Sequence, residues 1–135
     1  MGDTTEIDGA AFLRRYLGSL WELARDGVDA LREWETEDVR GRFPWGDANV
    51  PEWSNVEEHA AVLALMPRHL SAYELGEVAI RALEEPGRYV MEGSSTGTLK
   101  DGSGVLWNGW VSFVTLRDGK VADIREYGTS RRKRD

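Results

Sequence analysis

The chain has 135 residues and no cysteine, and its formal net charge is −7 at pH 7. This length suits one domain with a sizeable core, while the lack of cysteine excludes disulfides and thiolate metal sites. The acidic balance argues against nucleic acid as a partner, because phosphate repels an acidic surface. Neither a signal-peptide pattern nor an apolar run of about 20 residues is present, so we expect a cytoplasmic protein with no membrane partner.

The first half of the chain has the apolar spacing of helices. Asp8 is expected to cap a helix over about 9–25, in which apolar side chains recur three and four positions apart. Gly27 interrupts this pattern, and a short second helix is expected over 28–34. A short strand is expected to follow over 39–43.

A loop rich in proline and tryptophan separates this strand from a third helix. Asn55 is expected to cap that helix, which carries glutamates in its first turn, and Pro67 is expected to end it. The hydrophobic period then changes to that of strands, and turn sequences separate four of them. These strands are predicted over 71–83, 88–99, 105–116 and 120–128.

Helices followed by an antiparallel meander predict an α+β domain whose helices pack on one face of a sheet. We assign residues 1–130 to this single domain. The basic end of the chain, 131–135, is expected to be a disordered tail.

Alternation along the strands indicates which side chains share a face. Both faces of the 105–116 strand are largely apolar, which favours helices on one side and a second subunit on the other. Glu92 and Glu126 are assigned to corresponding faces of their strands. Alternation alone leaves open whether Glu126 is a surface charge beside Arg125 or points into the interior.

The order of the elements and the motif D-G-K-V-A-D-I-R-E-Y resemble the SnoaL-like branch of the nuclear-transport-factor-2-like superfamily over about 12–129. Members commonly continue with N-P or D-P, whereas this chain continues with G-T. The resemblance implies a cone-shaped α+β barrel, in which N-terminal helices pack on a strongly curved mixed or antiparallel sheet. It also implies that ligands enter between the helices and the sheet, and that the protein is a homodimer.

Three shorter motifs, E-E-H-A, M-E-G-S and R-E-Y, are similar to motifs of the phenazine-biosynthesis condensing proteins. By this resemblance His59 is the acid/base histidine, Glu126 is the glutamate of the last strand, and Glu92 is a third candidate catalytic residue. Burial raises the pKa of a carboxyl toward neutrality, where histidine also titrates, so such a pair suits proton transfer. The position of His59 on its helix is also compatible with a core histidine held by hydrogen bonds.

Further polar and aromatic residues are candidates for binding a substrate. Neutral hydroxyl and amide groups can orient a ligand without an ionisation cost, and aromatic rings can wall a cavity, although each ring is as compatible with an ordinary core position. The predicted substrate-binding residues are Trp110, Ser112, Asn108, Tyr16, Trp21, Trp45 and Trp53.

We therefore expect a cofactor-independent acid/base enzyme, a cyclase, isomerase or dehydratase, acting on a small hydrophobic carbonyl- or imine-bearing intermediate of secondary metabolism. Two histidines without HxH or HExxH spacing argue against a metal site, and no nucleotide-binding fingerprint is present. Epoxide opening, which relatives in the superfamily perform, usually requires an aspartate–arginine arrangement that the sequence does not identify. The alternative is a non-catalytic ligand-binding or dimerisation module on the same fold.

Overall fold

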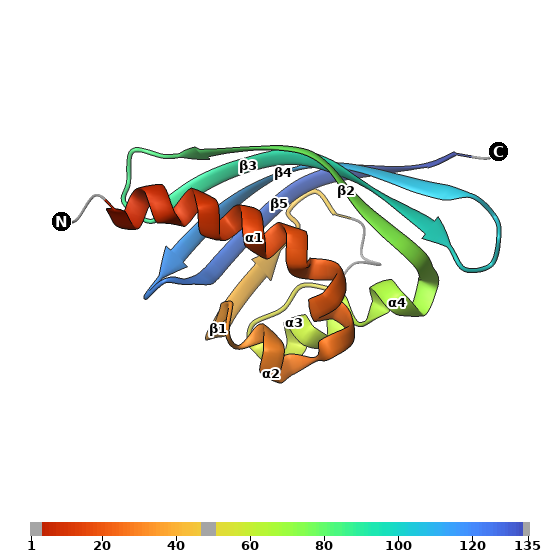
Figure 1. Ribbon diagram of the computed structural model, residues 1–135, viewed down its shortest axis with the longest axis horizontal. Helices are drawn as coiled ribbons and strands as arrows, with labels where there is room; N and C mark the ends of the chain where they lie inside the picture. Colours follow the sequence, from red (N-terminus) through yellow and green to blue (C-terminus); the bar gives the residue numbers. More distant parts are fainter. Residues whose placement is uncertain (1–3, 47–50, 134–135) are drawn as a thin grey trace.

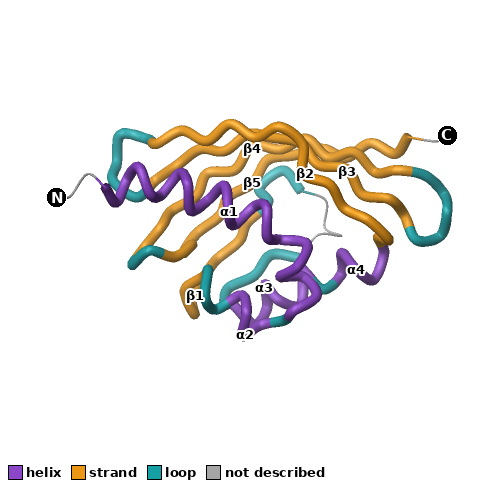
Figure 2. The backbone as a smooth tube through the Cα atoms, viewed as in Figure 1, coloured by secondary structure: helices purple, strands orange, loops and turns teal. Residues whose placement is uncertain are grey.

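A computed structural model describes residues 4–46 and 51–133 as helices packed on one curved sheet. The elements in chain order are α1 (Thr4–Asp26), α2 (Val28–Leu31), β1 (Glu35–Arg42), α3 (Val56–Leu63), α4 (Leu65–His69), β2 (Leu70–Ala82), β3 (Arg88–Leu99), β4 (Val105–Arg117) and β5 (Lys120–Lys133). Figures 1 and 2 show α1 crossing one face of the sheet, with the three short helices gathered on that same side. The predicted α+β class is confirmed.

The sheet is mixed, with strand order β1-β5-β4-β3-β2. The last four strands form the predicted antiparallel meander, while β1 pairs with β5 in parallel. The predicted strand over 39–43 is therefore longer than expected, because Glu35–Arg42 finds an available edge on β5. No helix in the described ranges is long and apolar enough to span a membrane.

The first helix begins earlier than predicted. Asp8 lies inside α1 and does not cap it, because the helix starts at Thr4. A Cβ atom at Gly9 would lie 2.0 Å from the hydroxyl oxygen of Tyr89, so the helix passes very close to β3 at this glycine. Packing against the sheet thus outweighs the local preference of Asp8 for a capping position and of Gly9 against a helix interior.

Pro67 does not end the third helix. That helix, α3, ends at Leu63, and Pro67 lies in the first turn of the separate helix α4. Proline is tolerated there because a first-turn N–H has no acceptor within the helix.

The basic end of the chain is largely strand, contrary to the prediction of a disordered tail. In β5, Arg131, Arg132 and Lys133 pair with Trp107, Leu106 and Val105 of β4. The long strand β4 would otherwise leave backbone N–H and C=O groups unpaired at this edge, which favours continuation of β5. Residues 134–135 lie outside the described residues.

One face of the sheet and the apolar faces of the helices form the core. The largest contributions come from α1 and β3, in which Leu13, Tyr16 and Tyr89 are at most 2% exposed. Other buried core side chains are Leu17, Leu23, Leu31, Val39, Val56, Leu63, Met91, Val114, Val121 and Ile124. We call this the inner face of the sheet, and the opposite side the outer face.

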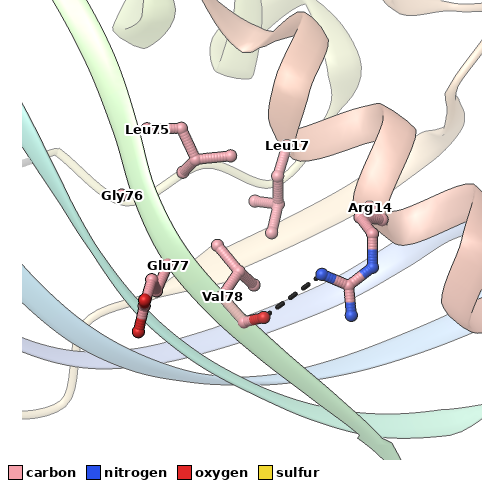
Figure 3. Close-up of a pocket in the computed structure, with 6 residues that line it drawn as sticks. All are labelled: Arg14, Leu17, Leu75, Gly76, Glu77 and Val78. Atoms are coloured by element: carbon pink, nitrogen blue, oxygen red, sulfur yellow. Dashed lines mark hydrogen bonds between the residues drawn. The ribbon is translucent and has the colours of Figure 1, made fainter.

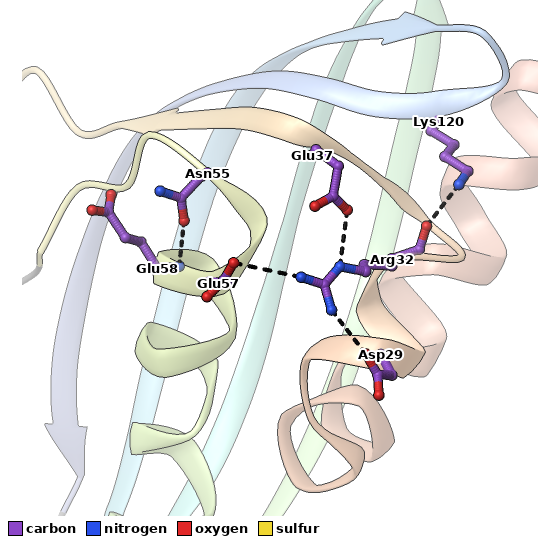
Figure 4. Close-up of polar contacts among 7 residues, drawn as sticks. All are labelled: Asp29, Arg32, Glu37, Asn55, Glu57, Glu58 and Lys120. Carbon is purple, nitrogen blue, oxygen red and sulfur yellow. Dashed lines mark hydrogen bonds and ion pairs between the residues drawn. The ribbon is translucent and has the colours of Figure 1, made fainter.

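Polar contacts at the start of α3 hold the helical layer in place (Figure 4). Asn55 caps α3 as predicted, because its Oδ1 accepts a hydrogen bond of 2.8 Å from the backbone N–H of Glu58. Arg32, just after α2, lies 2.9 Å from a carboxylate oxygen of Glu37 on β1 and 3.5 Å from one of Glu57 on α3. These contacts join the two elements that carry the buried polar residues described next.

Candidate active site

Glu126 lies on the inner face of β5, where it is half-buried. It pairs across the sheet with Ser112, which is 1% exposed, and the hydroxyl of Ser112 donates a 2.8 Å hydrogen bond to its Oε1. Burial raises the pKa of the Glu126 carboxyl above its ordinary value of 4.5, while the hydrogen bond from Ser112 and the charge of His59 oppose that rise. Glu126 therefore points into the interior and is not a surface charge beside Arg125, which settles the question that alternation left open.

His59 lies on the inner side of α3 and is 3% exposed. Its Nδ1 is 2.8 Å from Oε1 and 2.7 Å from Oε2 of Glu35. A carboxylate only accepts hydrogen bonds, so Nδ1 carries the hydrogen and Nε2 is the nitrogen that can accept or release a proton. The imidazole also stacks on the indole of Trp53, with ring centroids 3.8 Å apart and planes 7° apart.

Glu35 is the functional candidate that the sequence did not reveal. It is 1% exposed at the start of β1, and its Oε2 accepts a 2.6 Å hydrogen bond from the hydroxyl of Tyr16. In the sequence it stands in the charged run E-T-E-D, which is typical of a solvated strand end. Its burial follows from the parallel pairing of β1 with β5, which aligns Glu35 with the fully buried Val121.

Two tyrosines share the interior with Glu126. Burial raises the pKa of Tyr16 well above its ordinary value, and the nearby charges of Glu35 and Glu126 raise it further. Burial also raises the pKa of Tyr73 on β2. A hydrogen bond with Ser95 opposes this rise, and the charge of Glu126 adds to it. Both shifts indicate that these groups face one poorly solvated interior.

Two of the predicted tryptophans also lie on this side of the sheet. Trp21 of α1 stacks on Tyr73 at 6.0 Å, and a Cβ atom at Gly93 would lie 3.0 Å from the ring of Trp110. Trp110 is therefore on the inner face, two residues along β4 from Ser112.

No protein-family model matches the sequence, and no curated protein does. Solved structures do match. A candidate isomerase from Bacillus subtilis is 16% identical with a TM-score of 0.74, over 92% of this chain and 88% of that one. A candidate SnoaL-like polyketide cyclase from Jannaschia sp. CCS1 is 21% identical with a TM-score of 0.63, over 89% and 84%. A phenazine biosynthesis-related protein from Pseudomonas aeruginosa is 20% identical with a TM-score of 0.60, over 82% and 78%.

Other matching structures are described as NTF2-like proteins. The chain has the nuclear transport factor 2-like fold. The superfamily resemblance seen in the sequence is confirmed at the level of the fold, since TM-scores of 0.60–0.74 at identities of 14–21% show a shared fold.

The nuclear transport factor 2-like sheet leaves two predicted site residues outside. Glu92 is exposed and pairs with Val111, so it lies on the outer face and not with Glu126. The assignment was wrong because a shift of one residue in register moves a side chain to the other face. Trp45 is 81% exposed and contacts the outer-face ring of Tyr127 at 4.7 Å, so it does not wall the interior.

Asn108 lies on the inner face but away from the centre of the site. Its Oδ1 accepts a 2.6 Å hydrogen bond from the hydroxyl of Ser130 near the exposed end of β5. It could contact a ligand only at the rim of the interior.

Residues 4–46 and 51–133 of this NTF2-like fold form a hollow on each side of the sheet. One, of about 410 Å³, lies between α1 and β2, where β2 has an irregular register between Leu75 and Val78 (Figure 3). Arg14 donates a 3.2 Å hydrogen bond to the carbonyl of Val78 at its edge. The other, of about 890 Å³, lies over the outer face. Neither hollow is lined by His59 or Glu126.

Among residues 4–46 and 51–133, no group of three or more histidine or carboxylate side chains is arranged to hold a metal ion.

Proposed function

We propose that this protein is a cofactor-free enzyme that moves protons on a small hydrophobic substrate bearing a carbonyl or imine. The observation that carries the proposal is the inner-face position of Glu126, a carboxyl whose pKa burial raises, within the electrostatic influence of His59. A carboxyl tuned in this way can accept and return a proton at physiological pH. Cyclisation, isomerisation and dehydration of an intermediate in secondary metabolism all fit this chemistry.

In the proposed reaction, one member of the Glu126–His59 pair takes a proton from the carbon beside the carbonyl. The C–H electron pair forms a C=C bond, and the π pair of the carbonyl moves onto oxygen. Return of a proton to a different carbon gives isomerisation, loss of a neighbouring hydroxide as water gives dehydration, and attack on a second carbonyl gives cyclisation. The surrounding apolar side chains exclude water, which strengthens each charge interaction.

The neighbouring groups have supporting roles in this proposal. Ser112 orients Glu126 and stabilises its ionised form through the 2.8 Å hydrogen bond. Glu35 and Tyr16 are positioning residues, because they hold His59 with Nδ1 protonated and leave Nε2 for proton transfer. Among the matching structures, the descriptions of polyketide cyclases and of an LEH-like epoxide hydrolase support an enzymatic role for this fold.

The test measures exchange of the α-protons of small cyclic ketones with deuterium in D2O by NMR. The wild-type protein should accelerate exchange above buffer for at least one ketone. Glu126→Gln and His59→Asn should each lower that rate by about 10²-fold or more, as expected for a general acid–base group. Glu74→Gln, which removes an exposed carboxylate on β2, is the matched control and should leave the rate unchanged.

Equal exchange rates in the wild type and both site variants would contradict the roles of Glu126 and His59. Ketone binding without any accelerated exchange would favour the non-catalytic ligand-binding module.

We also propose that a second copy of the chain covers the outer face of the sheet. The outer hollow is lined by apolar and aromatic groups that include Trp107, Val111 and Tyr127. Glu92 on β3 and Arg125 on β5 flank the central strand β4 on this face, since they pair with Val111 and Phe113. A two-fold axis parallel to β4 would bring β3 of one copy opposite β5 of the other, so that opposite charges meet twice.

Charge reversal tests this arrangement. Wild-type protein should sediment as a dimer, and Glu92→Arg and Arg125→Glu should each dissociate it because like charges then face one another. Mixing the two variants should restore a dimer, since one copy of each variant brings opposite charges together at both contacts. A monomeric wild type, or variants that fail to recover when mixed, would refute the proposed arrangement.

A further inference from the structure

The indole N–H of Trp53 is a buried donor that finds no acceptor among the described residues. Trp53 is 5% exposed, and an indole nitrogen can only donate a hydrogen bond. The large majority of buried side-chain polar atoms in proteins have a hydrogen-bond partner, and leaving one unpaired is costly. An unpaired donor beside a candidate acid/base residue points to an acceptor that a ligand supplies.

The ring of Trp53 is held so that this donor cannot turn away. Its backbone forms two hydrogen bonds with Gly41, of 2.9 and 3.2 Å. A Cβ atom at Gly41 would lie 2.0 Å from Cε2 of the indole, so the ring rests directly on the β1 backbone. Phe43 contacts the ring edge-on at 5.6 Å, and His59 covers its other side. The N–H direction is therefore set before any ligand arrives.

The stacking geometry relates this donor to the imidazole. The two rings are 3.8 Å apart and 7° from parallel, so Nε1 of Trp53 lies in a plane that runs alongside the His59 ring. Hydrogen bonds to an N–H are close to linear, so an acceptor held by Nε1 lies near the indole plane. An oxygen bound there would lie near the plane of an indole that stacks directly on the His59 ring.

We propose that Trp53 binds the oxygen atom of the substrate through Nε1–H, which makes a carbonyl oxygen part of what this site recognises. The inference rests on the proposed function and adds the group that holds the substrate. When a proton leaves the adjacent carbon, negative charge develops on that oxygen, and a fixed donor in a water-poor site stabilises it. Trp53 thus selects substrates whose reacting carbon lies next to an oxygen acceptor.

The experiment follows the indole N–H resonances of 15N-labelled protein, of which the sequence supplies six. The resonance of Trp53 is the one lost in Trp53→Phe, a substitution that keeps an aromatic ring against His59. Cyclohexanone is the probe, and methylenecyclohexane, which has CH2 in place of oxygen, is the control ligand. The Trp53 resonance should move to lower field with cyclohexanone and should not do so with methylenecyclohexane.

Binding supplies a second readout. Trp53→Phe should weaken cyclohexanone binding by roughly 2- to 10-fold, the value of one net hydrogen bond. Trp45→Phe, at an exposed position on the outer face, should bind as the wild type does. If Trp53→Phe does not fold, the wild-type shift still decides, with the Trp53 resonance assigned through its contacts with His59.

A Trp53 resonance that cyclohexanone leaves unmoved, or moves no more than methylenecyclohexane does, overturns this inference. If the wild type still catalyses ketone exchange in that case, the proposed function stands without the Trp53 contact. A resonance that shifts while no exchange is catalysed supports the Trp53 site and counts against the enzyme.

Discussion

Replacing Glu126 by glutamine should stabilise the protein near neutral pH. The folded protein holds the Glu126 proton more tightly than the unfolded chain, because burial raises the pKa of this carboxyl above 4.5. As pH rises from the unfolded to the folded pKa, the unfolded state loses a proton that the folded state keeps, and the free energy of unfolding falls. Above the folded pKa the wild type bears the full free-energy cost of a buried ionised carboxyl. The neutral side chain of glutamine has no such cost.

The size of the effect follows from the same linkage. Each pH unit between the two pKa values costs the wild type about 1.4 kcal/mol. For a domain of this length, 1 kcal/mol corresponds to a change in Tm of roughly 3–5 °C. The amide oxygen of glutamine can still accept the hydrogen bond from Ser112, so little is lost in exchange.

Thermal unfolding followed by circular dichroism from about pH 4 to pH 8 measures this difference. The Tm of Glu126→Gln should exceed that of the wild type at the upper end of the range and converge with it at the lower end. Glu74→Gln should show no such pH-dependent gain, because its carboxylate is exposed. A Glu126→Gln protein that is no more stable than the wild type at about pH 8 would refute the argument that burial of this carboxyl is costly.

Three further substitutions test the network around the site. Tyr16→Phe removes the hydroxyl that donates to Glu35, so urea unfolding should show a loss of about 1.5–3 kcal/mol; an unchanged midpoint would mean that Glu35 is not a buried acceptor. Asn55→Ala should cost about 1 kcal/mol in the same assay, with Asn55→Asp as a control that keeps a capping oxygen, and equal stability of the two variants would contradict the cap. Arg32→Ala should change the urea midpoint little, because its partners are exposed, and a loss that persists at high salt would argue against a solvent-screened cluster.

Much of the fold could be predicted from local pattern. The meander was recognisable because each strand is bounded by turn sequences, and the observed strands β2 to β4 differ from the predicted ones by at most a residue at either end. Two of the errors fall where a distant element supplies the stabilisation. Asp8 is helical because α1 packs closely on β3, and the basic end of β5 is ordered because β4 runs alongside it.

The candidate site divides in the same way. His59 and Glu126 were identified by resemblance, and the register of β4 and β5 confirmed that Glu126 lies on the inner face. Glu92 was wrongly grouped with them, since a side chain changes face with each step along a strand. Glu35 was missed, because nothing in its local sequence distinguishes it from an exposed carboxylate.

By itself the sequence determined the class of fold, the order of its elements and the capped helix that carries His59, because these depend on hydrophobic period, turn residues and a single cap. Only the tertiary structure decided which carboxyls are buried. The reason is physical: the pKa and reach of Glu35 and Glu126 depend on strand pairing and desolvation by residues far away in the chain, and no local pattern encodes them.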